Sequence, residues 1–383
     1  MTAVPEATPS PLDVPGHFAS LPDPRHPVFR DFHLFGDIVA IALCAVLSGA
    51  TSWEAVAGFG RRKQQWLSSL GLKLPNGIPS HDTFNRVFAA INPRAFQDCF
   101  NGWLCSVCDA LGVTHIPIDG KALRGTRGPD GTCLHLVSAW ASEGRLTLAQ
   151  VAVADKSNEI TAIPKLLQML DLEGALVSID AIGCQKEIAS GVLAAGGDYL
   201  LAVKENQPTL HADVVAAFED AEGAGFVGVR HDSHATKETG HGRQEERRYT
   251  VLYDLDGLST RDDWEGLTSV VRVVRRRRRG EKESVEVAYY ISSSEAAALV
   301  LARGIRLHWG IENGCHWVLD VVFGEDRCRT RHGHAAENLA WLRKIVLSLL
   351  SQERRKASYR TTLFELAIDD EYRLELLRKL LSQ

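Results

Sequence analysis

Apolar residues recur every three or four positions from His33 to about Val113, a spacing typical of amphipathic helices. The pattern runs through HLFGDIVAIALCAVLSGA and SWEAVAGFGRRKQQWLSSLG. A further segment, PSHDTFNRVFAAI, begins with a helix-start signal in which Ser80 serves as N-cap. We therefore predict a helical domain over residues 17–113, preceded by a Pro-rich, disordered tail over residues 1–16.

From His115 onward the pattern changes to short apolar runs rich in β-branched residues, which predict strands. The runs HIPIDGKALRG, CLHLVSAWAS and LTLAQVAVADKS predict a three-stranded meander. GALVSIDAIGC and DYLLAVKEN predict two more strands, each preceded by a segment with helical spacing. A meander followed by alternating helices and strands predicts an α/β fold, a mixed sheet flanked by helices.

The alternation of strands and helices stops between residues 207 and 294. HGRQEERRYTVLYD, LTSVVRVVRRRRR and KESVEVAYYISS predict strands joined by charged turns. Helical spacing returns in EAAALVLARGIRLHWGIENGCHWVLDVV and in HAAENLAWLRKIVLSLLSQERRK. We therefore predict one α/β domain over 114–206 and 295–352, interrupted by a β-rich insertion over 207–294, with a C-terminal helical tail over 353–383.

Composition places the chain among ordinary globular proteins, with 45% hydrophobic and 24% charged residues in a length of 383. The apolar stretch from Ile38 to Ala50 is too short to span a bilayer, and the N-terminus has no apolar signal core, so we expect a cytoplasmic, nucleoid-associated protein. The eight cysteines have no framework spacing and are expected to be reduced. Cys105 and Cys108 form a lone CxxC in an apolar helical stretch, which favours a place in the core over a zinc site.

Charge is unevenly distributed along the chain. The net charge of −5 neither supports nor excludes a nucleic-acid partner, because affinity depends on local phosphate neutralisation. A dense basic strip lies in the β-rich segment and comprises Arg272, Arg275, Arg276, Arg277, Arg278 and Arg279. We favour DNA contact for it, since such a cluster would otherwise repel itself. A solvated hairpin end is the alternative, because a strand turns only half of its side chains toward one duplex.

Two aspartates stand at the ends of predicted buried strands, where the sites of open sheets form. Asp119 follows Ile116–Ile118, and Asp180 follows LVSI. A carboxylate there costs free energy of solvation unless it is paired or bound to a cation. Each aspartate alone is also typical of a turn or a helix cap. On neighbouring strands, the two together favour a divalent-metal site of the kind that Mg²⁺ prefers.

A third acid, Glu312, lies in IRLHWGIENGCHWVLD and shares a helix face with His308, Cys315 and His316. It is either buried and paired or a metal ligand. A zinc site is the competing interpretation, but the spacing matches no standard zinc pattern; its ligands would be Cys315, His316, Cys328, His332 and His334. Three carboxylates suit phosphoryl transfer with two divalent ions. Lys121, Arg124 and Lys204 then either meet phosphate oxygens or are surface charges.

Five motifs in this order resemble the DDE transposases of the ISAs / H-repeat-associated group of bacterial insertion sequences. They are PIDGKALRGT, SIDAIGCQKEIA, YLLAVKENQ, HGRQEERR and HWGIENGCHWVLDVVFGED. LPDPRHP, ALCAVLSGATSW and PSHDTFNRVF are similar to that group's associated N-terminal domain. The resemblance extends from about Phe18 to about Ser351.

The resemblance implies an RNase H-like catalytic core with a β-rich insertion before the last acid. It implies that Asp119, Asp180 and Glu312 are the catalytic, metal-binding triad, with Mg²⁺ as cofactor and Mn²⁺ as a substitute. The implied reaction cleaves the ends of an insertion sequence and joins them to target DNA. The implied partners are double-stranded DNA and a second copy of the chain, in a homodimer assembled on that DNA.

Further residues fall on motifs of this group. His241, Gly242 and Arg243 fall on the HGR motif, and Asn313, His316 and Trp317 on the motif around the last acid; among them we expect Arg243 and His316 to contact DNA. Cys315 stands where an apolar residue is usual. His308 and Leu319 replace the Arg and Lys of the broader Tyr–Arg–Glu–Lys signature, which leaves a hairpin step open. Two other functions remain open: an idle or domesticated DNA-binding relic, and a metal-dependent nuclease without strand transfer.

Overall fold

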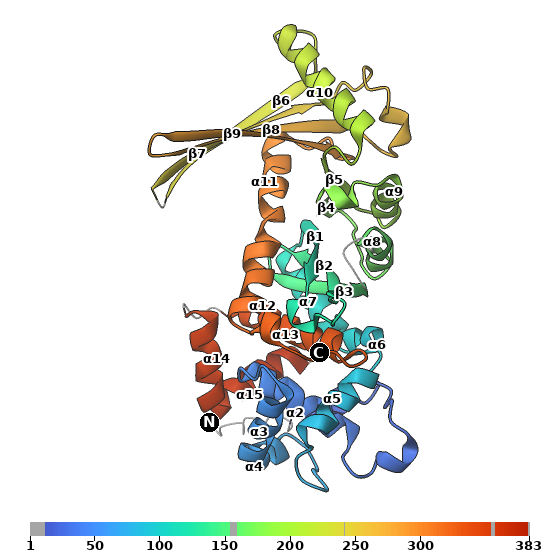
Figure 1. Cartoon of the computed structure of the whole chain (residues 1–383), viewed down its shortest axis with the longest axis vertical. Coiled ribbons are helices and arrows are strands. Elements are labelled where there is room, and N and C mark those ends of the chain that lie inside the picture. The colour runs from blue at the N-terminus through green and yellow to red at the C-terminus, as the bar shows by residue number, and fades with distance from the viewer. Residues whose placement is uncertain (1–11, 154–158, 241, 354–356, 382–383) are drawn as a thin grey trace, which may run out of the picture. The chain divides into compact units, whose positions relative to one another are not determined.

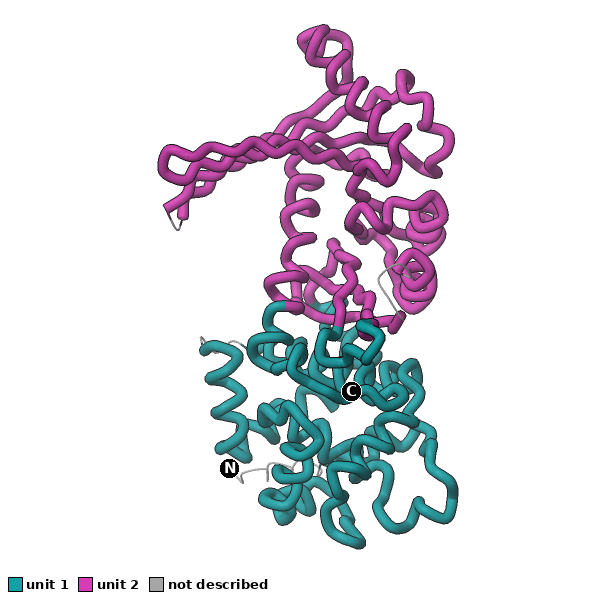
Figure 2. Tube along the Cα trace, in the orientation of Figure 1, with its two compact units in different colours: residues 1–110, 123–131, 317–383 teal, residues 111–122, 132–316 magenta. Residues whose placement is uncertain are grey.

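The computed structural model describes residues 12–153, 159–240, 242–353 and 357–381. The chain divides into two compact units (Figure 2). Unit 1 comprises residues 1–110, 123–131 and 317–383, and unit 2 comprises residues 111–122 and 132–316. Within the described residues, no helix combines the length and apolar character needed to cross a membrane.

Unit 1 is helical, as the spacing of apolar residues predicts. Its longer helices are α2 (Phe35–Leu47), α3 (Trp53–Arg62), α5 (His81–Ala90), α7 (Asn101–Leu111), α13 (Ala335–Ser351), α14 (Tyr359–Ile368) and α15 (Asp370–Leu381). Shorter ones are α1 (Val14–His17), η1 (Pro27–Phe29), α4 (Gln64–Ser69), α6 (Pro93–Asp98), η2 (Arg124–Thr126), α12 (Trp317–Val321) and η7 (Glu325–Arg327). Helix α1, capped by Asp13, begins inside the segment expected to be a tail.

Helix α13 lies at the centre of unit 1 rather than in the α/β domain to which its position in the sequence assigned it. Residues 335–350 are all buried, and the helix packs against α5 and α2. Asn338 is fully buried and donates hydrogen bonds to the carbonyls of Phe88 (2.8 Å) and Ile91 (3.0 Å). A helix that is buried on every side carries no apolar stripe to indicate its partner.

Unit 2 contains a nine-stranded mixed sheet with the order β3-β2-β1-β4-β5-β9-β8-β7-β6 (Figure 1). The first five strands are β1 (His115–Ala122), β2 (His135–Ala141), β3 (Leu146–Val153), β4 (Leu176–Ile179) and β5 (Asp198–Val203). The meander β1–β2–β3 is antiparallel, whereas β4 and β5 continue the sheet parallel to β1. This order and direction confirm the predicted RNase H-like core.

Helices cover both faces of this core. On one face, α8 (Glu159–Leu167) and α9 (Lys186–Ala194) pack on apolar residues such as Ile118, Val177 and Tyr199. On the opposite face, α11 (Ala298–His308) packs on Leu200 and on later strands of the sheet (Figure 1). Since side chains alternate along a strand, residues 115, 117 and 119 of β1 lie on the α11 face.

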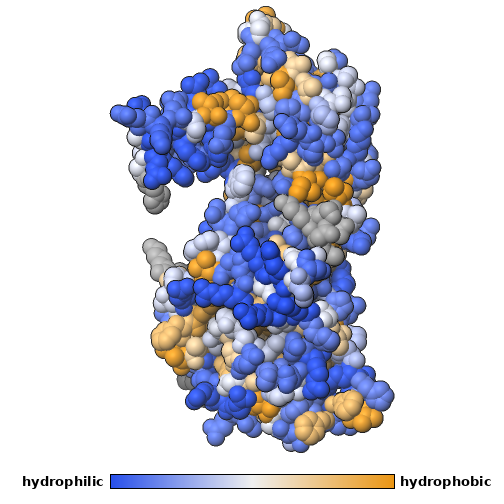
Figure 3. Space-filling model, in the orientation of Figure 1, coloured by the Kyte–Doolittle hydropathy of each residue, from blue (hydrophilic) through white to orange (hydrophobic). Residues whose placement is uncertain are grey.

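The predicted β-rich insertion is part of this same sheet. It contains α10 (Pro208–Gly223) and the strands β6 (His231–Gly240), β7 (Arg243–Leu252), β8 (Ser269–Arg279) and β9 (Lys282–Ser292), with η5 (Arg261–Asp263) between β7 and β8. Strand β9 pairs with β5 and thereby joins the segment to the core. The far ends of β6–β9 form a long arm whose tip is hydrophilic in Figure 3, with an apolar patch beside it. Val285 and Val287 are exposed on β9.

Candidate active site

The two aspartates belong to neighbouring parallel strands, but only Asp180 stands at a strand end, because β1 continues past Asp119 to Ala122. Ile118 of β1 is paired with Ile179 of β4; Asp119 is the next residue of β1, and Asp180 directly follows the last residue of β4. Adjacent strands are about 4.8 Å apart, so the two carboxylates leave the sheet at the same level. Asp180 also begins the short helix η4 (Ala181–Gly183), and its Oδ1 accepts a hydrogen bond of 3.1 Å from the Ile182 amide. The predicted helix cap and the predicted strand-end acid are therefore the same residue.

The backbone after Asp119 is held close to helix α8. A Cβ at Gly120 would lie 2.4 Å from Oε1 of Glu159, so this position has no room for a side chain. Glu159 is buried and lies 3.8 Å from Nδ1 of His135. The glycine of the IDGK motif therefore allows β1 to pass this carboxylate while Asp119 turns toward the opposite face.

Glu312 is brought to the aspartates by an irregular helix. After α11 the chain forms a single π-helical segment over Glu312–His316, the kind of irregularity that often marks functional sites. Gly310 and Gly314 flank Glu312, and a Cβ on either would lie 3.0 Å from the ring of Trp140 on β2. The two glycines let this segment approach the sheet closely enough to carry Glu312 toward Asp119.

Asp119, Glu312 and His316 each offer a ligand atom within 4.8 Å of the others, the one such group among the described residues. Nδ1 of His316 lies 3.5 Å from Oδ2 of Asp119 and 3.6 Å from Oε2 of Glu312. Burial, and then the Glu312 carboxylate, raise the pKa of Asp119 to about 8. The hydrogen bond from His316 outweighs burial and lowers the pKa of Glu312. Without a cation, Asp119 therefore keeps a proton at neutral pH beside the ionised Glu312, and a bound cation would favour the loss of that proton.

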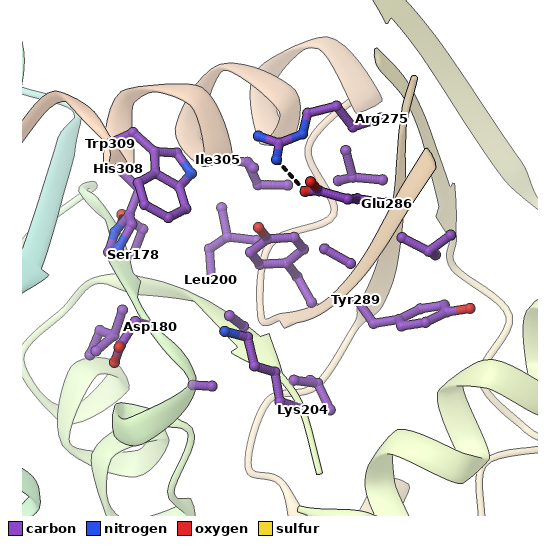
Figure 4. Close-up of a pocket in the computed structure, with 18 of the residues that line it drawn as sticks. Ser178, Asp180, Leu200, Lys204, Arg275, Glu286, Tyr289, Ile305, His308 and Trp309 are labelled. Carbon is purple, nitrogen blue, oxygen red and sulfur yellow. Dashed lines mark hydrogen bonds and ion pairs between the residues drawn. The ribbon is translucent and has the colours of Figure 1, made fainter. Parts of the chain in front are cut away.

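A second histidine lies behind Asp180. The Ser178 hydroxyl and Nδ1 of His308 are 3.0 Å apart, and Figure 4 shows the two side chains together above Asp180. Burial lowers the pKa of His308, which favours the neutral imidazole. His308 therefore joins the end of α11 to β4 at the level of the acids.

The loop that follows Asp180 is tied to the end of β5. Asn206 donates a hydrogen bond of 2.6 Å to the carbonyl of Ala181, and Gln207 donates one of 2.9 Å to that of Cys184. Both amides belong to the VKENQ motif. They hold the backbone that positions Asp180.

The three acids open into one pocket of about 1060 Å³ on the α11 face of the sheet. Lys204 extends into this pocket just beyond β5, near Asp180 (Figure 4). Trp309 lies on the opposite side and is 57% exposed. Arg275 and Glu286, which pair with one another, line the part formed by the later strands. A phosphate-bearing substrate would therefore meet carboxylates and one lysine in the same cavity.

The donor set fits a hard divalent cation better than zinc. Asp119, Asp180 and Glu312 supply carboxylate oxygens, which Mg²⁺ and Mn²⁺ prefer. His316 is buried against two of these acids, a place from which it orients them. The cysteines are free thiols, and among the described residues neither Cys315 nor Cys328 joins a group of three metal-ligating side chains. The structure thus offers no support for the zinc interpretation.

The residues expected to contact DNA are dispersed. Lys121, on the same face of β1 as Asp119, is only 8% exposed. Arg124 belongs to unit 1, where its Nε lies 3.9 Å from Asp326. Arg243 begins β7 and lies 3.8 Å from Glu245, whereas His241 is outside the described residues. Of the predicted DNA contacts outside the strip, only Lys204 lines the pocket of the acids.

The basic strip of β8 is divided between the two faces of the sheet and partly neutralised. Three of its arginines meet carboxylates: Arg272 with Glu222, Arg275 with Glu286, and Arg277 with Glu245. Glu245 is only 3% exposed and also pairs with Arg247. The expected self-repulsion is therefore relieved from within the protein.

The other arginines of the strip are left without such partners. Within the described part of the chain, none of the three has a carboxylate within ion-pair distance, and Arg278 only donates to the Gly280 carbonyl (3.4 Å). They are Arg276, Arg278 and Arg279. Half of the strip thus remains available to a polyanion.

Comparison with known proteins shows the family of this chain. The family model described as "Transposase DDE domain" matches residues 112–349, which include all three acids. The chain belongs to the DDE transposase family. The model described as "DDE_Tnp_1-associated" matches residues 16–104. The resemblance drawn from the five motifs is therefore confirmed, and the family is one of polynucleotidyl transferases and nucleases.

Relatives of this family member cover most of its length. "H repeat-associated putative transposase YhhI" of Escherichia coli strain K12 is 38% identical over 93% of this chain and 95% of its own. "Putative transposase YncI" of Escherichia coli O157:H7 is 40% identical over 83% of this chain and 82% of its own. A solved piggyBac transposase synaptic complex with hairpin DNA covers 91% of this chain and 73% of its own, with 11% identity and a TM-score of 0.38. That last similarity is too low to carry any residue across.

Several residues that build this candidate site could not be recognised from the sequence alone. Trp140 and Ser178 look like ordinary strand residues, and their contacts with Gly314 and His308 cross large separations in the chain. Gly310 and Gly314 could have indicated the close approach of this segment to the sheet, since glycine within a helical pattern often marks close packing. Asn206 could have been singled out as a polar residue just beyond a buried strand.

Proposed function

We propose that this protein is a DNA transposase that cleaves the ends of an insertion sequence and joins them to target DNA. The observation that carries the proposal is the convergence of Asp119, Asp180 and Glu312 in one pocket within the domain matched by the family model. The raised pKa of Asp119 supports it, since strongly perturbed carboxyls cluster at functional sites.

The proposed cofactor is Mg²⁺, with Mn²⁺ as a substitute, held as two ions by Asp119, Asp180 and Glu312. When bound, such ions stabilise charge on the attacking and leaving oxygens of an in-line displacement at phosphorus. The chain itself supplies no nucleophile: water attacks in the cleavage step, and the DNA 3′-hydroxyl attacks in the joining step. His316 holds Glu312 ionised and directed toward Asp119.

The proposed partner is double-stranded DNA, both as element end and as target. Lys204 lines the same pocket as the acids, where it could contact a DNA phosphate bound beside them. The unpaired arginines of β8 belong to the same sheet. Such an enzyme must hold two element ends, so we propose a homodimer assembled on DNA. Both relatives named above carry the description "putative transposase", which supports the same partner.

The test is cleavage and strand transfer on a duplex taken from the DNA that flanks the coding sequence, with and without Mg²⁺. Asp119→Asn, Asp180→Asn and Glu312→Gln are each expected to abolish both products. Glu205→Gln removes another carboxylate from the same pocket and is expected to leave activity near the wild-type level. Full activity in any triad variant would refute the assignment of that acid.

The same assay separates the alternatives. Cleavage without transfer would identify a metal-dependent nuclease. Binding of the duplex with neither product, under conditions in which Mg²⁺ binds the protein, would identify an idle DNA-binding relic.

A further inference from the structure

A second basic surface lies in unit 1 and is separate from the basic strip of β8. Arg327, Arg329 and Arg331 are exposed, whereas the intervening Cys328 and Thr330 are half-buried. The chain is extended here, with φ −74° and ψ 118° at Cys328. Alternation in an extended segment turns the three guanidinium groups toward solvent together.

The loop of residues 123–131 adds two arginines to this surface. A Cβ at Gly125 would lie 2.1 Å from the Cys328 carbonyl oxygen, so the loop packs directly on the extended segment. Arg331 donates a hydrogen bond of 3.4 Å to the Gly125 carbonyl. Gly125 thus brings Arg124 and Arg127 beside the three arginines. We call this set the arginine face: Arg124, Arg127, Arg327, Arg329 and Arg331.

The arginine face borders a pocket of about 630 Å³. Its walls are the first turns of α3 and α5 together with residues 327–332. Two acids, Glu54 and Asp82, already lie in these first turns. They satisfy the positive helix ends, and we therefore assign anion binding to the arginines rather than to the helix dipoles.

Thr51 in the wall of this pocket, and η7 before the extended segment, are both in contact with helix α13. The buried Arg343 donates a hydrogen bond of 2.9 Å to the carbonyl of Thr51 and lies 4.0 Å from Glu325, the first residue of η7. Helix α13, which carries Arg343, is buried along its length. The extended segment is thus presented from the core of unit 1 rather than from a free loop.

The arginine face differs from the basic strip of β8 in how many of its arginines are paired with carboxylates. On β8, Arg272, Arg275 and Arg277 meet carboxylates. In the described residues of unit 1, Arg127, Arg327 and Arg329 have no acidic partner at all. Arg124 is 74% exposed and only 3.9 Å from Asp326, a weak surface pair. Uncompensated guanidinium groups in a row are the electrostatic footprint of a polyanion site.

We propose that the arginine face binds the sugar–phosphate backbone of double-stranded DNA, independently of base sequence. This proposal rests on the proposed function, since it takes DNA as the substrate, and it locates a contact in unit 1 that the metal-binding acids do not provide. Guanidinium groups suit phosphate oxygens because their donors match them in pairs.

The test measures DNA affinity against salt concentration for Arg327→Ala/Arg329→Ala, without Mg²⁺ so that nothing is cleaved. Two duplexes of equal length are used, one from the DNA flanking the coding sequence and one of scrambled sequence. Both are expected to bind more weakly by the same factor, and the slope of log K against log salt is expected to fall by about 0.9 for each lost phosphate contact. Arg329→Lys is expected to keep the wild-type salt slope, since it keeps the charge, but to lose part of the affinity, since it lacks the paired donors.

A double variant, Arg94→Ala/Arg378→Ala, removes the same charge from α6 and α15 of the same unit and serves as the matched control. Affinity and slope equal to the wild type in the Arg327/Arg329 variant would overturn the proposal. So would a loss confined to one duplex with an unchanged slope, which indicates base readout. A wild type that binds neither duplex would instead refute the proposed function itself.

Discussion

Replacing Asp119 by asparagine is expected to stabilise the metal-free protein at neutral pH while removing its response to Mg²⁺. The Asp119 side chain is only 17% exposed. Burial and the neighbouring Glu312 carboxylate raise its pKa to about 8, from an ordinary value of 3.8. Asparagine has nearly the same shape but never ionises, so it escapes the cost of a buried charge.

The size of the effect follows from proton linkage. Between pH 3.8 and about 8 the folded protein keeps a proton on Asp119 that the unfolded chain has lost. The free energy of unfolding therefore falls as the pH rises through this window, by about 1.4 kcal/mol for each pH unit. From pH 5 to pH 7 the wild type should lose about 3 kcal/mol relative to Asp119→Asn. The stability that protonated Asp119 contributes is complete below pH 3.8, the pKa in the unfolded chain, and is lost above about pH 8, the pKa in the folded protein.

Urea unfolding at pH 5, 6 and 7 in the presence of a chelator measures this difference directly. Added Mg²⁺ should then raise the stability of the wild type at pH 7, because a ligand that binds only the folded state stabilises it. It should leave Asp119→Asn unchanged. The exposed Asp262, replaced by asparagine in the same unit, is the control. A stability difference independent of pH, or an equal Mg²⁺ response in both proteins, would refute the reasoning.

Two further substitutions test the supports of the site and the charge of the arm. Asn206→Ala removes the hydrogen bond to Ala181 and should lower the free energy of unfolding by about 1 kcal/mol. It should also slow single-turnover cleavage without changing DNA affinity. An unchanged cleavage rate would exclude a positioning role for Asn206. Glu245→Gln breaks the buried ion pair with Arg247 and should lower the free energy of unfolding, measured with urea, by about 3 kcal/mol. It should also steepen the salt dependence of DNA binding. As a control, Glu281→Gln in the exposed β8–β9 turn should leave the folding stability unchanged.

The core of unit 2 could be predicted because its signals are local. Apolar β-branched runs ending in Asp119 and Asp180 indicate buried strands, and the paired Ile118 and Ile179 confirm that these strands are neighbours. Strand β6 was not predicted, because HDSHATKETG carries no apolar alternation at the exposed edge of the sheet. Helix α10 was also not predicted, because its residues were included in the segment 207–294 that was assigned to strands as a whole.

The fate of the charged residues could not be predicted in the same way. The run Arg275–Arg279 is the densest basic segment in the sequence, yet Glu245 and Glu286 neutralise part of it from adjacent strands. The sequence gives no reason to predict a DNA contact at Arg327 or Arg329, since single arginines are common on protein surfaces. Their lack of carboxylate partners among the described residues becomes visible only when the chain is folded.

By itself, the sequence determined most of the helical and strand segments, the two aspartates on neighbouring strands and the membership in a transposase family. Each of these depends on residues close together in the chain or on motifs in a fixed order. Only the tertiary structure decided that α13 packs in unit 1, that Gly310 and Gly314 bring Glu312 close to Trp140, and which arginines keep their charge unpaired. These outcomes depend on contacts through space between distant segments, and periodicity along a chain carries no record of which distant residue will lie opposite.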